Sequence, residues 1–107
     1  MKKGDIVLVK YPFTDFSSEK LRPALILLPE DEEGDFLLAF ITSILIRKNP
    51  FDIQLPKGKT GLHKDSVLRL RKMMAVHKSL VIGKIGNASA EQWNIIETTL
   101  RKMFGLY

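Results

Sequence analysis

The spacing of the apolar residues changes once along this chain. Up to residue 76 they gather in short runs separated by proline, glycine and charged residues, at positions 6–9, 24–28, 36–41, 51–55 and 66–76. Such runs, bounded by turn residues, predict β-strands. From Trp93 to Phe104 apolar residues recur every three or four positions instead, which predicts an amphipathic helix. We therefore expect a strongly bent antiparallel sheet or small barrel with one terminal helix packed on it.

The predicted helix carries signals at both of its ends. Ser89 and Gln92 have the spacing of a capping box, in which each side chain bonds to the backbone N–H of the other residue. Arg101 and Lys102 fall in the expected last turn, where positive charge interacts favourably with the helix dipole. Residues 11–20 show no regular spacing of apolar residues and contain turn residues, so they are expected to form a loop.

Length and composition limit the class of protein. A chain of 107 residues is expected to form one domain over residues 1–107. It has no cysteine, which excludes disulfides and thiolate chemistry. No apolar run approaches the length of a membrane span, and no apolar stretch follows the two lysines at the start, so we expect a cytoplasmic protein without membrane contact. Association would stabilise so small a chain, and a homodimer is the expected form.

Charge is distributed unevenly along the sequence. The net charge is +5, from 17 Lys and Arg against 12 Asp and Glu. Residues 30–35 are mostly acidic, whereas residues 57–84 hold eight lysines and arginines against Asp65 alone. A basic region of this kind is a candidate contact for phosphates, and the alternative is that it only keeps the domain soluble.

Arg22 is the first candidate for chemistry. It precedes Pro23, and a residue before proline is held in extended geometry. A proline at the first position of a strand loses no ladder bond, so Pro23 would fix Arg22 where loop meets sheet. The planar guanidinium suits phosphate. The alternative is an arginine that pairs with the acidic turn.

Thr42 and Ser43 follow the predicted strand at residues 36–41. Hydroxyl groups at a strand end can donate hydrogen bonds to phosphate oxygens, or they can cap a turn. The sequence leaves both roles open.

The longest predicted strand carries two arginines. Strand alternation places Val67, Arg69, Arg71 and Met73 on one face, and Leu68, Leu70 and Met74 on the other. Arg69 and Arg71 would then stand about 7 Å apart. That spacing resembles the spacing of phosphates in an extended single strand. The alternative is a solvated face.

Histidine and metal chemistry have weaker support. Nothing in the sequence brings His63 and His77 together as a paired acid and base. No acidic or histidine cluster has the spacing of metal ligands, and neither glycine-rich nucleotide motif is present. We expect no metal and no cofactor.

Several short segments together resemble a known family. They are Gly-Asp-Ile-Val-Leu-Val at 4–9, Pro-Phe-Thr-Asp at 12–15, Lys-Leu-Arg-Pro-Ala-Leu-Ile-Leu at 20–27, Ala-Phe-Ile-Thr-Ser at 39–43, Gly-Leu-His-Lys-Asp-Ser-Val at 61–67, Ser-Leu at 79–80 and Lys-Ile-Gly at 84–86. In this order, across nearly the whole chain, they resemble the MazF/PemK family of type II toxins. The likeness is closest to the branch with the PFTD…K-x-RP form.

The resemblance implies a fold and an activity. The fold would be mainly β with a C-terminal helix, an SH3-like small barrel of the MazF, PemK and CcdB type, forming a homodimer. The activity would be metal-independent, sequence-specific cleavage of single-stranded RNA, often messenger RNA. An antitoxin with an acidic, disordered segment would hold the toxin in check.

The resemblance also assigns roles to individual residues. Arg22 and Thr42 match the family residues that act at the scissile phosphate, and Arg69 matches a strand arginine that contributes in some members. Beyond what the resemblance implies, we expect Lys20, Ser43, Arg69 and Arg71 to bind RNA. Some relatives have an acidic residue where this chain has Arg71, and a histidine in the first loop where this chain has Phe16-Ser17-Ser18. The groups that move protons are therefore not assigned. Two other functions stay open, namely a non-catalytic toxin of the same barrel that inhibits gyrase, and an SH3-like module that only binds nucleic acid or a peptide.

Overall fold

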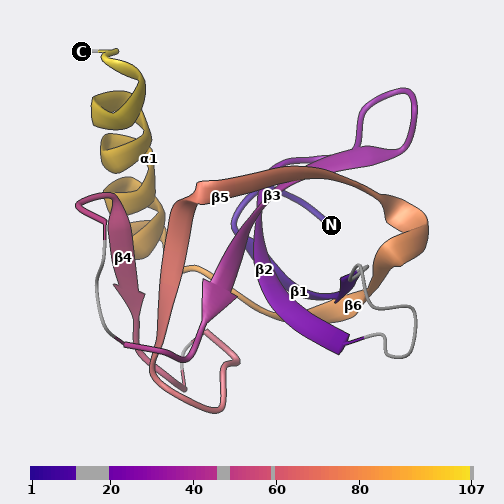
Figure 1. Ribbon diagram of the computed structural model, residues 1–107, viewed down its shortest axis with the longest axis horizontal. Coiled ribbons are helices and arrows are strands. Elements are labelled where there is room, and N and C mark those ends of the chain that lie inside the picture. Colours follow the sequence, from indigo (N-terminus) through magenta and orange to yellow (C-terminus); the bar gives the residue numbers. More distant parts are fainter. Residues whose placement is uncertain (12–19, 46–48, 59, 107) are drawn as a thin grey trace.

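The computed structural model describes residues 1–11, 20–45, 49–58 and 60–106, and within them it contains six strands and two helical segments (Figure 1). The elements are β1 (Asp5–Tyr11), β2 (Lys20–Leu28), β3 (Asp35–Thr42), β4 (Asp52–Leu55), β5 (Ser66–His77), the 3-10 helix η1 (Lys78–Leu80), β6 (Val81–Asn87) and α1 (Ala90–Phe104). The prediction of a mainly β fold with a C-terminal helix is confirmed.

All six strands belong to one antiparallel sheet. Its order is β4-β5-β3-β2-β1-β6, so β4 and β6 form the two edges. The sheet is strongly bent: β5 passes α1 and β4 at one end and curves round towards β6 at the other (Figure 1). In the described residues no helix is long and apolar enough to cross a membrane.

The bent sheet buries apolar side chains on both faces. One cluster includes Ile6, Leu25, Ile41 and Leu68 from the strands and is closed by Ile96 of α1, which is fully buried. A second cluster lies on the other face and is formed by Val7, Val9, Ala24, Ile26, Phe36, Leu38 and Val76. Leu80 and Val81 pack against this second cluster, so η1 and the start of β6 cover that face.

Both ends of α1 are capped. The Ser89 hydroxyl accepts a bond of 3.1 Å from the Gln92 N–H, and the Gln92 side chain accepts one of 3.0 Å from the Ser89 N–H. The predicted capping box is therefore confirmed. Gly105 ends the helix in the left-handed conformation, with φ of 70°, where glycine carries no steric penalty.

The predicted loop between the first two strands is shorter than expected. Tyr11 is the last residue of β1 and Lys20 the first of β2, and the two are paired. Residues 12–19, and with them Phe16-Ser17-Ser18, lie outside the described residues. Pro23 is consequently inside β2, and the prediction that it opens the strand is wrong. The proline is tolerated there because β2 is paired at Pro23 with β1 alone, and a missing N–H on the unpaired side breaks no ladder bond.

Strand β5 does not keep the regular alternation that was predicted for it. Ala39 and Phe40 are neighbours on β3, yet they pair with Met73 and Arg69 on β5, so the register shifts between them. A shift of this kind changes which face the following side chains occupy. Met73 packs with the cluster beneath α1, whereas Met74 is 41% exposed, and their predicted faces were therefore wrong.

Strand β6 and η1 were not predicted. A close contact between two glycines helps to fix β6. A Cβ on Gly86 would lie 1.8 Å from the carbonyl oxygen of Thr60, and a Cβ on Gly61 would lie 2.0 Å from that of Ile85. Both distances are far below van der Waals contact, so only glycine fits at either position. The segment that contains Thr60 and Gly61 is thereby packed directly on β6.

Candidate nucleic-acid site at the ends of β2 and β3

The candidate site forms where β2 and β3 separate. The last pair of the β2–β3 ladder is Ala24 with Phe40. Beyond it β2 stays paired with β1, through Arg22 and Val9, while β3 stays paired with β5. In the same register, Arg22 would lie opposite Thr42. The two strands diverge at this point, and each carries a polar residue into the gap between them.

A pocket of about 540 Å³ occupies this gap. Its apolar lining comes from Leu8, Leu21, Pro23, Ile41, Ile44, Leu62 and Ile85. Its polar lining comes from Lys20, Arg22, Thr42, Ser43, His63, Lys64 and Ser66. None of these described lining residues carries a carboxylate, while three are cationic. The pocket therefore suits an anionic group that is attached to an apolar or aromatic one.

Arg22 is held by aromatic side chains. Its guanidinium carbon lies 5.9 Å from the centre of the Tyr11 ring, within the range of a cation–π contact. The Tyr11 ring in turn meets the Phe40 ring edge-on, with 5.1 Å between centres and 88° between planes. β1, β2 and β3 thus jointly position an exposed arginine.

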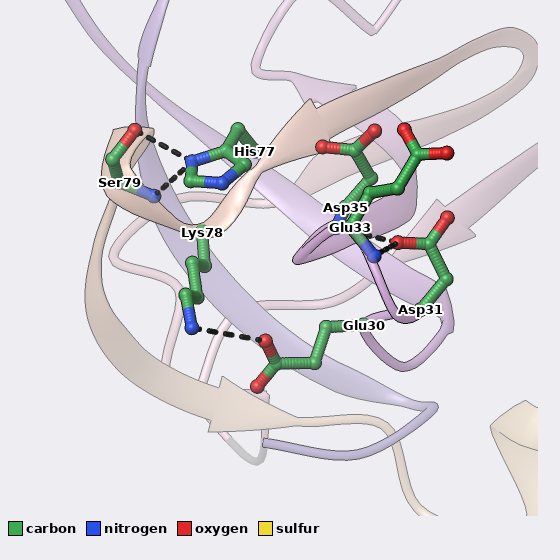
Figure 2. A network of polar contacts seen from close by, with 7 residues as sticks. All are labelled: Glu30, Asp31, Glu33, Asp35, His77, Lys78 and Ser79. Carbon is green, nitrogen blue, oxygen red and sulfur yellow. Dashed lines mark hydrogen bonds and ion pairs between the residues drawn. The ribbon is translucent and has the colours of Figure 1, made fainter.

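The alternative role for Arg22, an ion pair with the acidic turn, is wrong. The turn follows the far end of β2, about 20 Å from Arg22 by the rise of a strand. Asp31 organises the turn itself, because its Oδ1 accepts bonds from the N–H groups of Glu33 at 2.9 Å and Asp35 at 3.0 Å (Figure 2). Glu30 pairs with Lys78, with 3.7 Å between Oε2 and Nζ.

These pairings also divide the basic region at residues 57–84. Lys78 pairs with Glu30 beside the acidic turn (Figure 2), and this turn lies at the end of the β3–β5 ladder opposite to Thr42. Lys84 lies on β6, with Nζ 3.3 Å from the buried Asp5 Oδ1. Of the basic residues in this region, Lys64 lines the pocket. The cationic character of the pocket depends more on Lys20 and Arg22, which precede the region.

Thr42 has the geometry of a turn cap. Its Oγ1 accepts a bond of 3.2 Å from the backbone N–H of Ile44. A hydroxyl that accepts one bond still has a hydrogen to donate, so capping and phosphate contact are compatible. The side chain is half-buried, whereas Ser43 beside it is exposed, and both line the pocket.

Arg69 and Arg71 lie elsewhere. Arg69 is paired in register with Asp52 on β4, and its Nε is 3.9 Å from the buried Asp52 Oδ1. Arg71 is exposed and lines a different pocket, together with Phe51, Met103 and Phe104 near α1. The structure therefore brings Lys20, Arg22, Thr42 and Ser43 together, and it does not bring Arg69 or Arg71 into the same pocket.

The two histidines are separated by the length of β5. His77 is at its end, where Nδ1 lies 2.8 Å from the Ser79 hydroxyl and accepts a bond from the Ser79 N–H (Figure 2). His63 precedes β5 and lines the pocket with Arg22 and Thr42. The expectation that the histidines do not form a pair is confirmed. The position of His63 in the pocket was missed, because it depends on how the segment before β5 packs on β6.

The described residues contain no cluster of three or more His, Cys, Asp or Glu side chains arranged to hold a metal ion. The acidic turn is accordingly a hydrogen-bonded connection between β2 and β3.

Comparison with solved structures places the fold. The toxin MazF-mt6 of Mycobacterium tuberculosis is 21% identical, with a TM-score of 0.78 over 96% of this chain and 98% of that one. A MazE–MazF complex from Deinococcus radiodurans is 21% identical, with a TM-score of 0.79 over 100% of this chain and 97% of that one. An endoribonuclease with its cognate antitoxin, from a mycobacterial species, is 16% identical, with a TM-score of 0.77 over 100% and 97%. At these identities the likeness is one of fold.

Fold and pocket together define a small antiparallel β domain with a cationic pocket at the strand ends. A search among curated proteins found no similar sequence. The model of the PemK-like, MazF-like toxins of type II toxin–antitoxin systems matches residues 2–104. The chain belongs to this family.

Proposed function

We propose that this toxin is an endoribonuclease that cleaves single-stranded RNA, including messenger RNA, at specific sequences and without a metal or cofactor. The observation that carries the proposal is that Arg22 and Thr42, from the ends of two diverging strands, line one open cationic pocket. Two of the similar structures are endoribonucleases or MazF toxins bound to antitoxins, which supports the same activity.

The reaction uses the substrate's own nucleophile. The RNA 2′-hydroxyl attacks the adjacent phosphorus, the bond to the 5′-oxygen breaks, and the products are a 2′,3′-cyclic phosphate and a 5′-hydroxyl. Negative charge builds on the phosphate oxygens in the transition state. The Arg22 guanidinium and the Thr42 hydroxyl lower the barrier by donating hydrogen bonds to those oxygens.

Other residues hold the RNA. Lys20 and Ser43 line the same pocket and contact the phosphates next to the one that is cleaved. The apolar lining receives a base that is turned out of the stack. Arg69 and Arg71 lie on β5 outside the pocket, where they bind more distant phosphates of the strand.

The toxin acts in the cytoplasm, as a homodimer, and is neutralised by an antitoxin. Leu21 and Ile44 line the pocket and Leu45 follows Ile44, and each side chain is more than half exposed. Covering such side chains favours association with a second copy. An acidic, disordered segment of the antitoxin matches the cationic pocket and competes there with RNA.

The test is RNA cleavage by purified protein in EDTA, with the cut ends identified chemically and mapped. Wild-type protein is expected to leave 2′,3′-cyclic phosphates at one recurring sequence. Arg22→Ala is expected to be about 10²–10³-fold slower. Arg101→Ala is the matched control, because Arg101 is an exposed arginine of α1 that pairs with Glu97 on the same helix.

Each other outcome has a definite meaning. No cleavage by the wild-type protein would leave a gyrase inhibitor or a binding module as the function. Cleavage that EDTA abolishes would contradict the metal-independent mechanism. Equal rates for Arg22→Ala and Arg101→Ala would remove Arg22 from the reaction.

A further inference from the structure

We infer that His63 is the general base of this toxin and takes the proton from the attacking 2′-hydroxyl. The inference rests on the proposed function, and it assigns the proton-transfer step that Arg22 and Thr42 leave open. A guanidinium keeps its proton at any pH that a protein tolerates, and a threonine hydroxyl is a poor base. His63 is the imidazole among the described residues that line the pocket.

The segment that carries His63 is rigidly held. Within it, the Thr60 hydroxyl donates to the Pro56 carbonyl at 3.0 Å, and the Gly58 N–H donates to the Leu62 carbonyl at 3.2 Å. Leu62 is buried in the core next to His63, while His63 itself is exposed. Because Leu62 is anchored in the core, it fixes the backbone position from which the His63 side chain extends.

Two further contacts fix the segment to the barrel. The close approach of Gly61 to the Ile85 carbonyl and of Gly86 to the Thr60 carbonyl fastens the segment to β6. On the other side of His63, the Ser66 hydroxyl donates to the Lys64 carbonyl at 2.9 Å, and Ser66 begins β5. His63 thus belongs to the pocket lining, on a segment that Gly61, Leu62 and Ser66 fix to the barrel.

The proton balance of the step is complete. The bond between the 2′-oxygen and phosphorus forms while the 2′-hydroxyl proton passes to an imidazole nitrogen of His63. The bond between phosphorus and the 5′-oxygen breaks, and the leaving oxygen takes a proton from a water molecule in the open pocket. The imidazolium returns its proton to the hydroxide so formed, which restores the enzyme.

The charged groups around His63 in the described residues are mostly cationic. Lys20 and Arg22 line the pocket from β2, and Lys64 follows His63 in the chain. Asp65 is the nearby acid on the same segment, and its Oδ1 accepts a bond of 3.0 Å from the Lys57 N–H. Cationic neighbours of this kind attract the RNA phosphates to the pocket that His63 lines.

The test compares His63→Gln with His77→Gln, which makes the same change at the far end of β5. His63→Gln is expected to lower the rate of RNA cleavage about 10²–10⁴-fold, the usual contribution of a general base, and His77→Gln to leave it unchanged. The wild-type rate is expected to rise with pH through the range where imidazoles lose a proton and then to level off. His63→Gln is expected to lose that rise. Imidazole added to His63→Ala is expected to restore part of the rate.

The outcomes separate this inference from the proposed function. If the wild-type protein cleaves RNA and His63→Gln cleaves it equally fast, the inference is overturned while the function holds. A wild-type rate that falls as the imidazole deprotonates would make His63 an acid and would also overturn it. A wild-type protein that cleaves no RNA would overturn both. Circular dichroism of each variant shows whether a lost rate reflects lost folding.

Discussion

Arg22 and Thr42 lie two residues beyond the last pair of the β2–β3 ladder, one on each strand, where continued pairing would set them opposite each other. Instead β2 follows β1, β3 follows β5, and a pocket opens between the two residues. Cross-strand partners normally touch one another. Here the divergence leaves space between them for a substrate group that both can contact.

The first prediction concerns the Thr42 hydroxyl. Thr42→Val keeps the shape of the side chain and removes its donor, so RNA cleavage is expected to slow about 10²-fold. Thr42→Ser keeps the hydroxyl, both as a donor and as the acceptor for the Ile44 N–H, and is expected to stay within about 10-fold of wild type. The measurement is the single-turnover rate. If valine and serine variants are equally active, the hydroxyl takes no part in the reaction.

A second prediction concerns Lys20. A lysine that contacts a phosphate releases a counterion, so Lys20→Ala is expected to lower the salt dependence of affinity by about 0.7 in the slope of log K against log salt. A single-stranded oligonucleotide with 2′-deoxy sugars serves as the ligand, because it lacks the nucleophile. Lys102→Ala is the control, since Lys102 is exposed in the last turn of α1. Equal slopes for the two variants would place Lys20 outside the phosphate contacts.

The third prediction concerns two glycines of the same strand. Gly86→Ala forces a Cβ to within 1.8 Å of the Thr60 carbonyl oxygen, and it is expected to lower the free energy of unfolding by about 3 kcal/mol. At Gly83 an added Cβ meets nothing within 4 Å, so Gly83→Ala is expected to change the free energy of unfolding by less than about 1 kcal/mol. Urea denaturation measures both variants. Similar stabilities would mean that the segment at Thr60 is not packed on β6.

A fourth prediction concerns the buried Asp5. Burial by itself raises the pKa of its carboxyl, but the Lys2 N–H at 2.9 Å and the Lys84 ammonium at 3.3 Å outweigh burial and hold that pKa below its ordinary value of 3.8. A lowered pKa in the folded state means that Asp5 stabilises the fold above its unfolded pKa. This stabilisation is lost as the pH falls through the folded pKa.

The variant for this prediction is Asp5→Asn. It is expected to be less stable than wild type by about 1–2 kcal/mol at pH 7, with the difference shrinking as the pH falls below about 4. Urea denaturation at several pH values measures the difference. A difference that stays constant down to pH 2 would contradict the assigned role of the Asp5 carboxylate.

Local patterns in the sequence were sufficient to predict most of the elements. The core strands are short apolar runs bounded by turn residues, α1 has apolar residues at helical spacing, and Ser89 with Gln92 marks the helix start. Strand β6 was missed because Gly83 and Gly86 interrupt its apolar residues, and Gly86 is required by a contact with Thr60, far away in the chain. The register shift in β5 was missed for the same reason, because it depends on which residues of β3 lie beside it.

The candidate site was predicted in part. The proline after Arg22 and the hydroxyl groups at the end of β3 are visible in the sequence. The family resemblance predicted that Arg22 and Thr42 act at the same phosphate. The divergence of β2 and β3 at these residues depends on how the whole sheet is paired, so no local sequence pattern predicts it. His63 was weighed as half of a histidine pair, and its place in the pocket with Arg22 depends on how the segment before β5 packs on β6.

The central claim is that Arg22 and Thr42 act on one phosphate. Its most direct test is a crystal structure of the toxin with its mapped RNA target, in which a 2′-deoxy sugar at the cleavage position prevents attack. We predict that one non-bridging oxygen, or two on the same phosphorus, lies about 3 Å from both the Arg22 guanidinium and the Thr42 hydroxyl. A scissile phosphate that contacts neither, or that binds outside the pocket between β2 and β3, would contradict the account.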